Sequence, residues 1–154
     1  DEFYLINRCP TYRGSEYSSS GLPKIYLQDV GIYNALNGTL SESTLVNSEA
    51  MGPIFETVVC DHTRRLQFFL SNAQNADICY NDSGGEVDFV VDGTDYLLPI
   101  EVKNGDSTSR SLRGIKRFLD ARGAGFGICV NNADELDYED GIVHIPSWMF
   151  LFLC

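Results

Sequence analysis

The sequence has few residues of the types that mark zinc, redox or membrane-spanning segments. Its two histidines, His62 and His144, lie far apart, and its five cysteines include no Cys-x-x-Cys pair. This pattern argues against a zinc or dithiol site and predicts reduced, mostly buried cysteines. We expect both histidines to have structural or surface roles. The one sustained apolar stretch, residues 148–154, is too short to span a bilayer, so we expect no membrane partner.

Basic residues are also scarce. Lys and Arg number 11 against 22 Asp and Glu, which gives a net charge of −11. Proteins that bind nucleic acid usually carry a basic surface, because neutralisation of phosphates supplies much of the affinity. The composition therefore counts against nucleic acid as a partner.

The sequence also lacks a secretory signal segment and a phosphate-binding loop. No basic segment followed by an apolar run opens the chain, which predicts a cytoplasmic location. No Gly-x-x-x-x-Gly-Lys loop is present, so we expect no ATP binding of that kind. Because the first residue is Asp1, we expect the chain to be a piece of a longer protein.

The chain has the length and composition of one globular domain. It has 154 residues, of which 44% are hydrophobic and 21% charged. The predicted order of helix, strand, hairpin, helix and strand indicates an α/β domain with a mixed central sheet flanked by helices. We divide it into an N-terminal extension over residues 1–47 and a core over residues 48–154.

The N-terminal half has predicted elements with clear boundaries. Residues 3–7 and 24–27 read as extended, and residues 11–22 as a mobile loop. Asp29 caps a short helix over residues 30–36, which ends at Asn37-Gly38. A long helix should begin at Gly52-Pro53 and run to about Leu70. Its apolar stripe comprises Ile54, Phe55, Val58, Val59, His62, Leu66 and Phe69.

The C-terminal half has three more predicted strands besides the hairpin, at 77–81, 126–130 and 142–145. A helix over residues 111–122 follows Ser and Thr residues that can cap it, and it buries Leu112, Ile115, Phe118 and Leu119. A last helix from Pro146 should pack through Trp148, Phe150 and Leu151. Residues 131–141 form an acidic loop that lacks the spacing of a calcium loop, so a solvated turn is favoured over a cation site.

The most informative stretch runs from Glu86 to Lys103. Two strands, 87–91 and 96–102, flank Asp92-Gly93, a pair that closes tight hairpins. Antiparallel pairing brings Asp88 and Glu101 together at the open end of the hairpin. Because strand side chains alternate, Glu101 and Lys103 lie on one face.

This arrangement has a chemical interpretation. Crowded carboxylates repel each other unless a cation neutralises them. A magnesium ion takes one or two carboxylates, keeps several waters, and makes a bound water easier to deprotonate. Lys103 would hold that water or the scissile phosphate. The alternative is a surface hairpin whose Glu101–Lys103 pair contributes little.

Asp88 followed by Pro99-Ile-Glu-Val-Lys103 resembles the signature of the PD-(D/E)xK nuclease superfamily. Residues 24–36, 52–56 and 85–91, in that order, resemble the C-terminal nuclease-like domain found after the ATP-binding domain of prokaryotic AAA-type ATPases. The similarity covers nearly the whole chain.

The resemblance implies a restriction-endonuclease-like core and a metal-dependent nuclease. It implies that Glu56, Asp88 and Glu101 bind Mg²⁺ or Mn²⁺. The carbonyl of Val102 would add a ligand, and Lys103 would orient the attacking water. It also implies an ATPase domain upstream in the parent chain. Without the resemblance, Glu56 reads as an exposed glutamate that complements the positive start of its helix.

Several alternatives stay open at this point. Glu86 either supports the metal ligands without binding the metal itself or simply lies at the edge of the sheet. Arg110, Arg113 and Arg117 project opposite the apolar stripe of their helix, which favours a solvated face over a phosphate track. The chain could instead be a non-catalytic module that docks on the ATPase, or a nucleic-acid-binding domain without cleavage. A homo-oligomer is compatible with the sequence.

Overall fold

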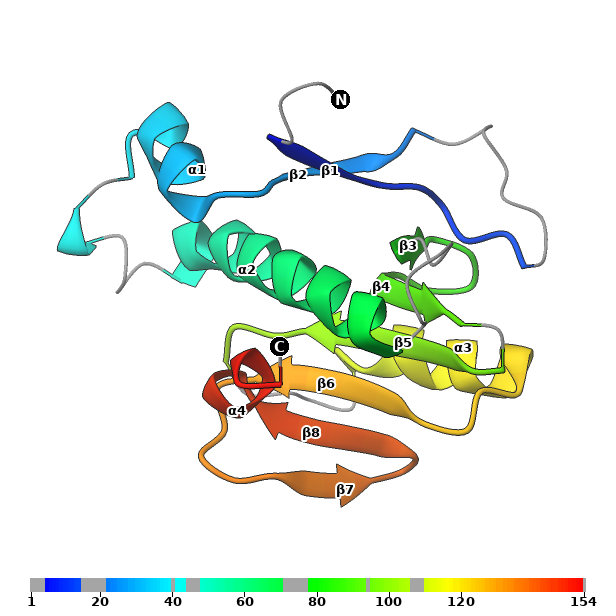
Figure 1. Ribbon diagram of the computed structural model, residues 1–154. Coiled ribbons are helices and arrows are strands. Elements are labelled where there is room, and N and C mark those ends of the chain that lie inside the picture. The colour runs from blue at the N-terminus through cyan, green and yellow to red at the C-terminus, as the bar shows by residue number, and fades with distance from the viewer. Residues whose placement is uncertain are drawn as a thin grey trace.

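The computed structural model describes residues 5–14, 22–39, 41–43, 48–70, 78–93, 95–105 and 110–153. Within these residues the centre of the fold is a six-stranded sheet with strand order β3-β4-β5-β6-β8-β7 (Figure 1). Its strands are β3 (Ile78–Asn81), β4 (Val87–Asp92), β5 (Leu97–Val102), β6 (Gly127–Asn131), β7 (Asp137–Glu139) and β8 (Ile142–Pro146). Strands β3, β4 and β5 are antiparallel, β5, β6 and β8 are parallel, and β7 is antiparallel to β8. The predicted mixed α/β architecture is confirmed.

Helices cover both faces of the sheet. Helix α2 (Ser48–Leu70) lies on one face and α3 (Arg113–Arg122) on the other (Figure 1). The alternation within β4 shows this division, because Phe89 belongs to the core under α2 and Val90 to the core under α3. Helix α4 (Ser147–Leu151) adds the fully buried Phe150 to the α2 side.

A separate two-stranded sheet packs on the α2 side of the core. It pairs β1 (Ile6–Cys9) with β2 (Lys24–Leu27) in antiparallel register, and α1 (Val30–Asn37) follows it. Tyr26 of β2 is buried, and its ring centroid lies 5.4 Å from that of Phe89. The β1–β2 hairpin therefore shares the hydrophobic core of the main sheet.

The chain after β1 continues along the edge strand β3. The Tyr80 N–H donates to the carbonyl of Pro10, and the Tyr12 N–H donates to the carbonyl of Tyr80. Thr11 and Tyr12 are buried. The prediction of a loop was therefore wrong for these two residues, which take part in backbone pairing that the sequence does not mark. Residues 15–21 of the predicted loop lie outside the described residues.

Two glycines set the position of α3 against the start of β4. A Cβ atom on Gly114 would lie 2.0 Å from the carbonyl oxygen of Glu86. A Cβ atom on Gly85 would lie 2.8 Å from the Cα of Gly114, and Gly85 has a φ of +141°. Such distances are too short for a side chain, so the first turn of α3 lies directly on the backbone that leads to Asp88.

Most predicted boundaries are close to the observed ones. Asp29 caps α1 by accepting from the Ile32 N–H at 2.9 Å, and Gly38 ends that helix in the left-handed region. Helix α2, however, begins at Ser48, before Gly52. Pro53 lies inside it, where its fixed φ suits the helix and it removes one backbone donor.

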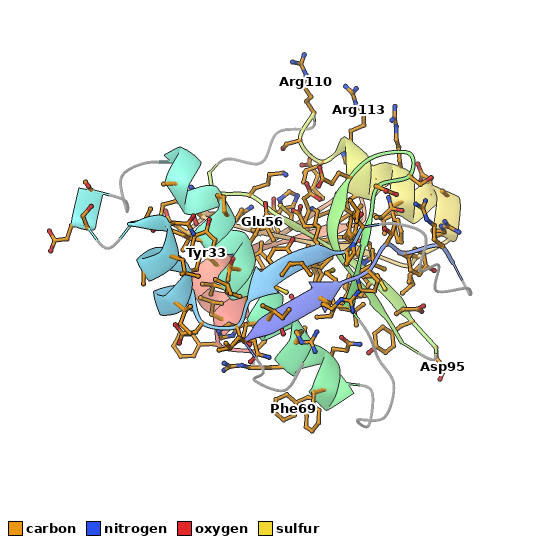
Figure 2. The ribbon with its side chains drawn as sticks, turned by 90° about the horizontal axis from the view of Figure 1, so that it is seen from above. Tyr33, Glu56, Phe69, Asp95, Arg110 and Arg113 are labelled. Atoms are coloured by element: carbon orange, nitrogen blue, oxygen red, sulfur yellow. The ribbon has the colours of Figure 1, made fainter. Side chains whose placement is uncertain are left out.

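Two aromatic residues expected in the core are exposed. Phe69 projects from the end of α2 and is 70% exposed (Figure 2). The buried face of α2 runs through Val59, Thr63 and Gln67 at steps of four, and Phe69 lies about 200° around the helix from Gln67. Trp148 is 53% exposed and contacts Phe152 instead of the core.

Other parts of the C-terminal half differ in detail. Helix α3 begins at Arg113, and its N-cap Leu112 makes no side-chain cap bond. The predicted acidic loop contains β7, an exposed edge strand with no apolar pattern to reveal it. The apolar stripe of α3 is buried as predicted.

The cysteines of the described segments are buried, as the composition predicted. Cys9, Cys60, Cys79 and Cys129 are buried and make no disulfide with one another, while Cys154 lies outside the described residues. Within the same segments, no helix combines the length and apolarity that a membrane span requires.

Candidate carboxylate site

Asp88 lies where the pairing of β4 and β5 ends. The last pair of the ladder on this side joins Phe89 to Ile100, and beyond it the Val102 N–H donates to Oδ2 of Asp88 at 2.9 Å. The Asp88 carboxylate thus accepts a backbone N–H of the neighbouring strand. It is 6% exposed, and the antiparallel register holds it next to Glu101, as the sequence predicted.

Glu101 is the most deeply buried carboxylate of this group, at 4% exposure. Its Oε1 accepts a hydrogen bond from Nζ of Lys103, while its Oε2 is buried and has no hydrogen-bond partner among the described residues. Lys103 is anchored by its backbone N–H, which donates to the carbonyl of Val130 at 2.9 Å. A buried oxygen without a partner costs free energy, so Oε2 of Glu101 is suited to bind a cation or a proton.

Burial and mutual repulsion favour the protonated carboxyls. Desolvation, together with the charge of Asp88, raises the pKa of Glu101 to about 7, and Lys103 offsets this in part. Burial also raises the pKa of Asp88, against the opposing effects of the Val102 N–H and the nearby lysines. The nearby positive charge is therefore too small to offset the effect of burial on the pKa of these two carboxyls.

Glu56 reaches the same region from α2, where Figure 2 shows it near the middle of the molecule. It is half-buried, and the Tyr26 hydroxyl donates to its Oε2 at 3.3 Å. Burial, and next the charge of Asp88, raise the pKa of Glu56. Asp88 therefore interacts electrostatically with both of the other predicted ligands, Glu56 and Glu101. Within the described residues, however, no three His, Cys, Asp or Glu side chains form a ready metal cluster.

Lys24 is a residue of this site that sequence reasoning missed. Its Nζ lies 2.6 Å from Oε1 of Glu86 and 3.8 Å from Oδ1 of Asp88, and 5.2 Å from the ring centroid of Tyr80. Burial lowers the pKa of Lys24, but the hydrogen bond to Glu86 and the nearby carboxylates more than offset this and raise it.

The strand that carries Lys24 explains its orientation. Lys24 and Tyr26 of β2 both face acidic residues, while Ile25 between them is 52% exposed. This alternation was the available signal, because it places the lysine on the same side as a tyrosine suited to a buried position. A single lysine in a short strand gave no reason to choose it.

The remaining predicted residues lie at the edge of the site. The Glu86 side chain is 64% exposed and reaches Asp88 by way of their shared partner Lys24. Arg110 and Arg113 extend outward at the start of α3 (Figure 2). Arg117 is exposed and donates to the carbonyl of Gly84 at 3.1 Å.

The donor atoms fit a hard divalent cation. They are carboxylate oxygens, and one of them, Oε2 of Glu101, is buried without a partner. When ionised, the carboxylates of Glu56, Glu86, Asp88 and Glu101 carry −4 and the ammonium groups of Lys24 and Lys103 carry +2, which leaves −2. One Mg²⁺ or Mn²⁺ would balance this charge, and two carboxylates are enough protein ligands for Mg²⁺.

Comparison with known protein families gave a match that covers most of the core. The family described as a domain of unknown function, DUF4143, matches residues 51–150. The chain belongs to the DUF4143 family. The residues matched to DUF4143 include Glu56, Asp88, Glu101 and Lys103, whereas Lys24 lies before them. Comparison with curated proteins and with solved structures gave no match.

Proposed function

We propose that this DUF4143 chain is a metal-dependent phosphodiesterase domain that hydrolyses nucleic acid with Mg²⁺ or Mn²⁺. The observation that supports this most is the buried, unpartnered Oε2 of Glu101 beside Asp88. Buried carboxylate oxygens normally have hydrogen-bond partners, so an unpartnered one beside a second buried carboxylate supports a functional role for the pair.

Each residue has a defined task in this proposal. Asp88 and Glu101 would hold the ion, with Glu56 and the carbonyl of Val102 as further ligands. The ion would supply neutralising charge and a more acidic water. The Val102 N–H holds Asp88 in place. Lys103, already paired with Glu101, would orient the water or a phosphate oxygen.

The charge of the chain restricts how a nucleic acid would bind. A net charge of −11 repels a phosphate backbone. Arg113 and Arg117 on α3 and Arg110 just before it are exposed and would serve as phosphate contacts. We propose that the upstream AAA-type ATPase domain or a second subunit supplies further positive charge.

The test is cleavage of labelled single- and double-stranded DNA and RNA in MnCl₂ and MgCl₂ by wild type and by Lys103→Ala. The control is Lys116→Ala, which removes the same charge from an exposed pair with Asp140. Thermal unfolding checks that both variants fold. We expect Lys103→Ala alone to lose cleavage by roughly 100-fold or more, the scale of lost general acid–base function. Cleavage retained in Lys103→Ala would contradict the assigned role.

A second function is supported by the lysine pairs. Lys24 and Lys103 already contact Glu86 and Glu101, and the described residues form no three-ligand cluster. These observations favour a non-catalytic site, and we propose as the second function a module that keeps the fold as a scaffold and docks on an ATPase of the kind that the sequence resemblance implies. Titration of the chain with the purified ATPase domain would test this. Binding without any cleavage would favour docking, and no binding would contradict it.

A further inference from the structure

Strand β2 brings a positive charge to a cluster that otherwise belongs to the family core. Lys24 lies before the matched residues 51–150, yet its Nζ is 3.8 Å from Oδ1 of Asp88. The neighbouring Tyr26 donates to Glu56. One strand outside the matched segment therefore contacts two of the three proposed metal ligands.

The two oxygens of Asp88 have different partners. Oδ2 accepts the Val102 N–H from β5, and Oδ1 faces the ammonium of Lys24. The backbone bond orients the carboxylate, which leaves Oδ1 as the oxygen available to a cation. Lys24 lies where that cation would approach, and two positive charges near one oxygen repel each other.

Lys24 also has a second partner that lies closer to solvent. Its distance to Oε1 of Glu86 is 2.6 Å, shorter than the 3.8 Å to Asp88, and the Glu86 side chain is 64% exposed. The ring of Tyr80 lies beside the same ammonium. Lys24 can therefore move away from Asp88 and keep a carboxylate partner.

We propose that Lys24 is a positioning residue whose ammonium acts as the counter-ion of Asp88 in the metal-free protein. When a divalent ion binds, the ammonium moves away from Asp88 and keeps Glu86 as its partner. This inference rests on the proposed function, since it requires a divalent ion at Asp88. The ammonium stabilises the metal-free carboxylates and competes with the metal. The affinity of the site for the ion is then set in part by the N-terminal hairpin.

The test is calorimetric titration of the full chain with MnCl₂, in wild type, Lys24→Met and Lys116→Met. The two variants lose the same charge, but Lys116 pairs with the exposed Asp140. We expect Lys24→Met to bind Mn²⁺ roughly tenfold more tightly, a coupling of ordinary size, and Lys116→Met to match wild type. If Lys24 had only a structural role, its replacement would not raise the affinity of the site for Mn²⁺.

Thermal unfolding gives a second readout that does not depend on the calorimetric signal. Without metal, Lys24→Met should melt below wild type because Asp88 and Glu86 lose their counter-ion, and MnCl₂ should raise its melting temperature more than that of wild type. Mn²⁺ binding that is seen in Lys24→Met but not in wild type would also support the displacement of Lys24 by the ion. Equal or weaker affinity in Lys24→Met than in wild type overturns the inference and leaves the metal site standing. Absence of binding in both proteins overturns the metal-based function as well.

Discussion

The molecule has two acidic regions built from the same residue types and with opposite properties. In the carboxylate site, Asp88 and Glu101 are 6% and 4% exposed, and burial raises the pKa of each. Around β7, every residue from 132 to 140 is exposed. There the pKa of Asp140 is lowered, because Lys116 donates a hydrogen bond to it.

The difference shows that burial, more than the number of charges, raises the pKa of a carboxylate. The β7 region holds more acidic residues in a short stretch, but water solvates them and the described residues form no metal cluster there. The two buried carboxylates are fewer and were removed from water at a cost in free energy. Such a cost is normally offset by a partner or a function.

The largest expected difference concerns metal binding. Asp88→Asn should weaken Mn²⁺ binding by at least roughly 100-fold, because even partners of metal ligands are worth roughly 10–100-fold. Asp137→Asn, in exposed β7, should leave the affinity unchanged. Calorimetric titration of both variants checks this, and equal affinities would place the ion away from Asp88.

The next prediction concerns the pH dependence of stability in the metal-free protein. Because the folded pKa of Glu101 is about 7 and its ordinary value is 4.5, the folded state keeps a proton that the unfolded state loses between these values. The stability from this group is fully present below pH 4.5 and is lost as pH rises to 7. Glu101→Gln should therefore be more stable than wild type above pH 7, by up to about 3 kcal/mol.

Urea unfolding of both proteins with a chelator, from pH 5 to 9, measures this difference. A stability difference that does not change with pH would show that Glu101 stays ionised when folded.

A third prediction concerns the close packing beside the carboxylate site. Gly114→Ala should lower the free energy of unfolding by about 1–3 kcal/mol, because its Cβ would clash with the Glu86 carbonyl beside the carboxylate site. Gly52→Ala, whose Cβ would meet nothing within 4 Å in α2, should stabilise by up to about 1 kcal/mol. Denaturant unfolding measures both, and equal effects would contradict the close approach of α3 to β4.

The smallest effect belongs to the exposed region and has the opposite sign. The pKa of Asp140 is below its ordinary value of 3.8, so its contribution is present above pH 3.8 and is lost as pH falls through the lowered value. Lys116→Met should remove this small acid-side dependence. Unfolding curves between pH 2 and 5 would show it, and an unchanged slope would mean that the pair contributes nothing in solution.

The local sequence was enough to predict the hairpin and its polar residues. Strand alternation and the Asp92-Gly93 turn are properties of neighbouring residues, so Asp88, Glu101 and Lys103 could be placed at one end of the hairpin. The cap at Asp29 and the stop at Gly38 were predictable for the same reason. The roles of these residues in catalysis stay predictions.

The tertiary structure alone decided what surrounds those residues. Lys24 is 62 residues from Glu86 in the chain, and β2 reaches it because Tyr26 packs on Phe89. The exposure of Phe69 likewise depends on how α2 meets the sheet. Periodicity indicates that a helix or strand has an apolar face, but packing against distant segments fixes its rotation and extent. A pairwise contact between distant segments leaves no pattern in either one, so strand alternation could place Lys24 on the same side as Tyr26 but could not identify its carboxylate partners.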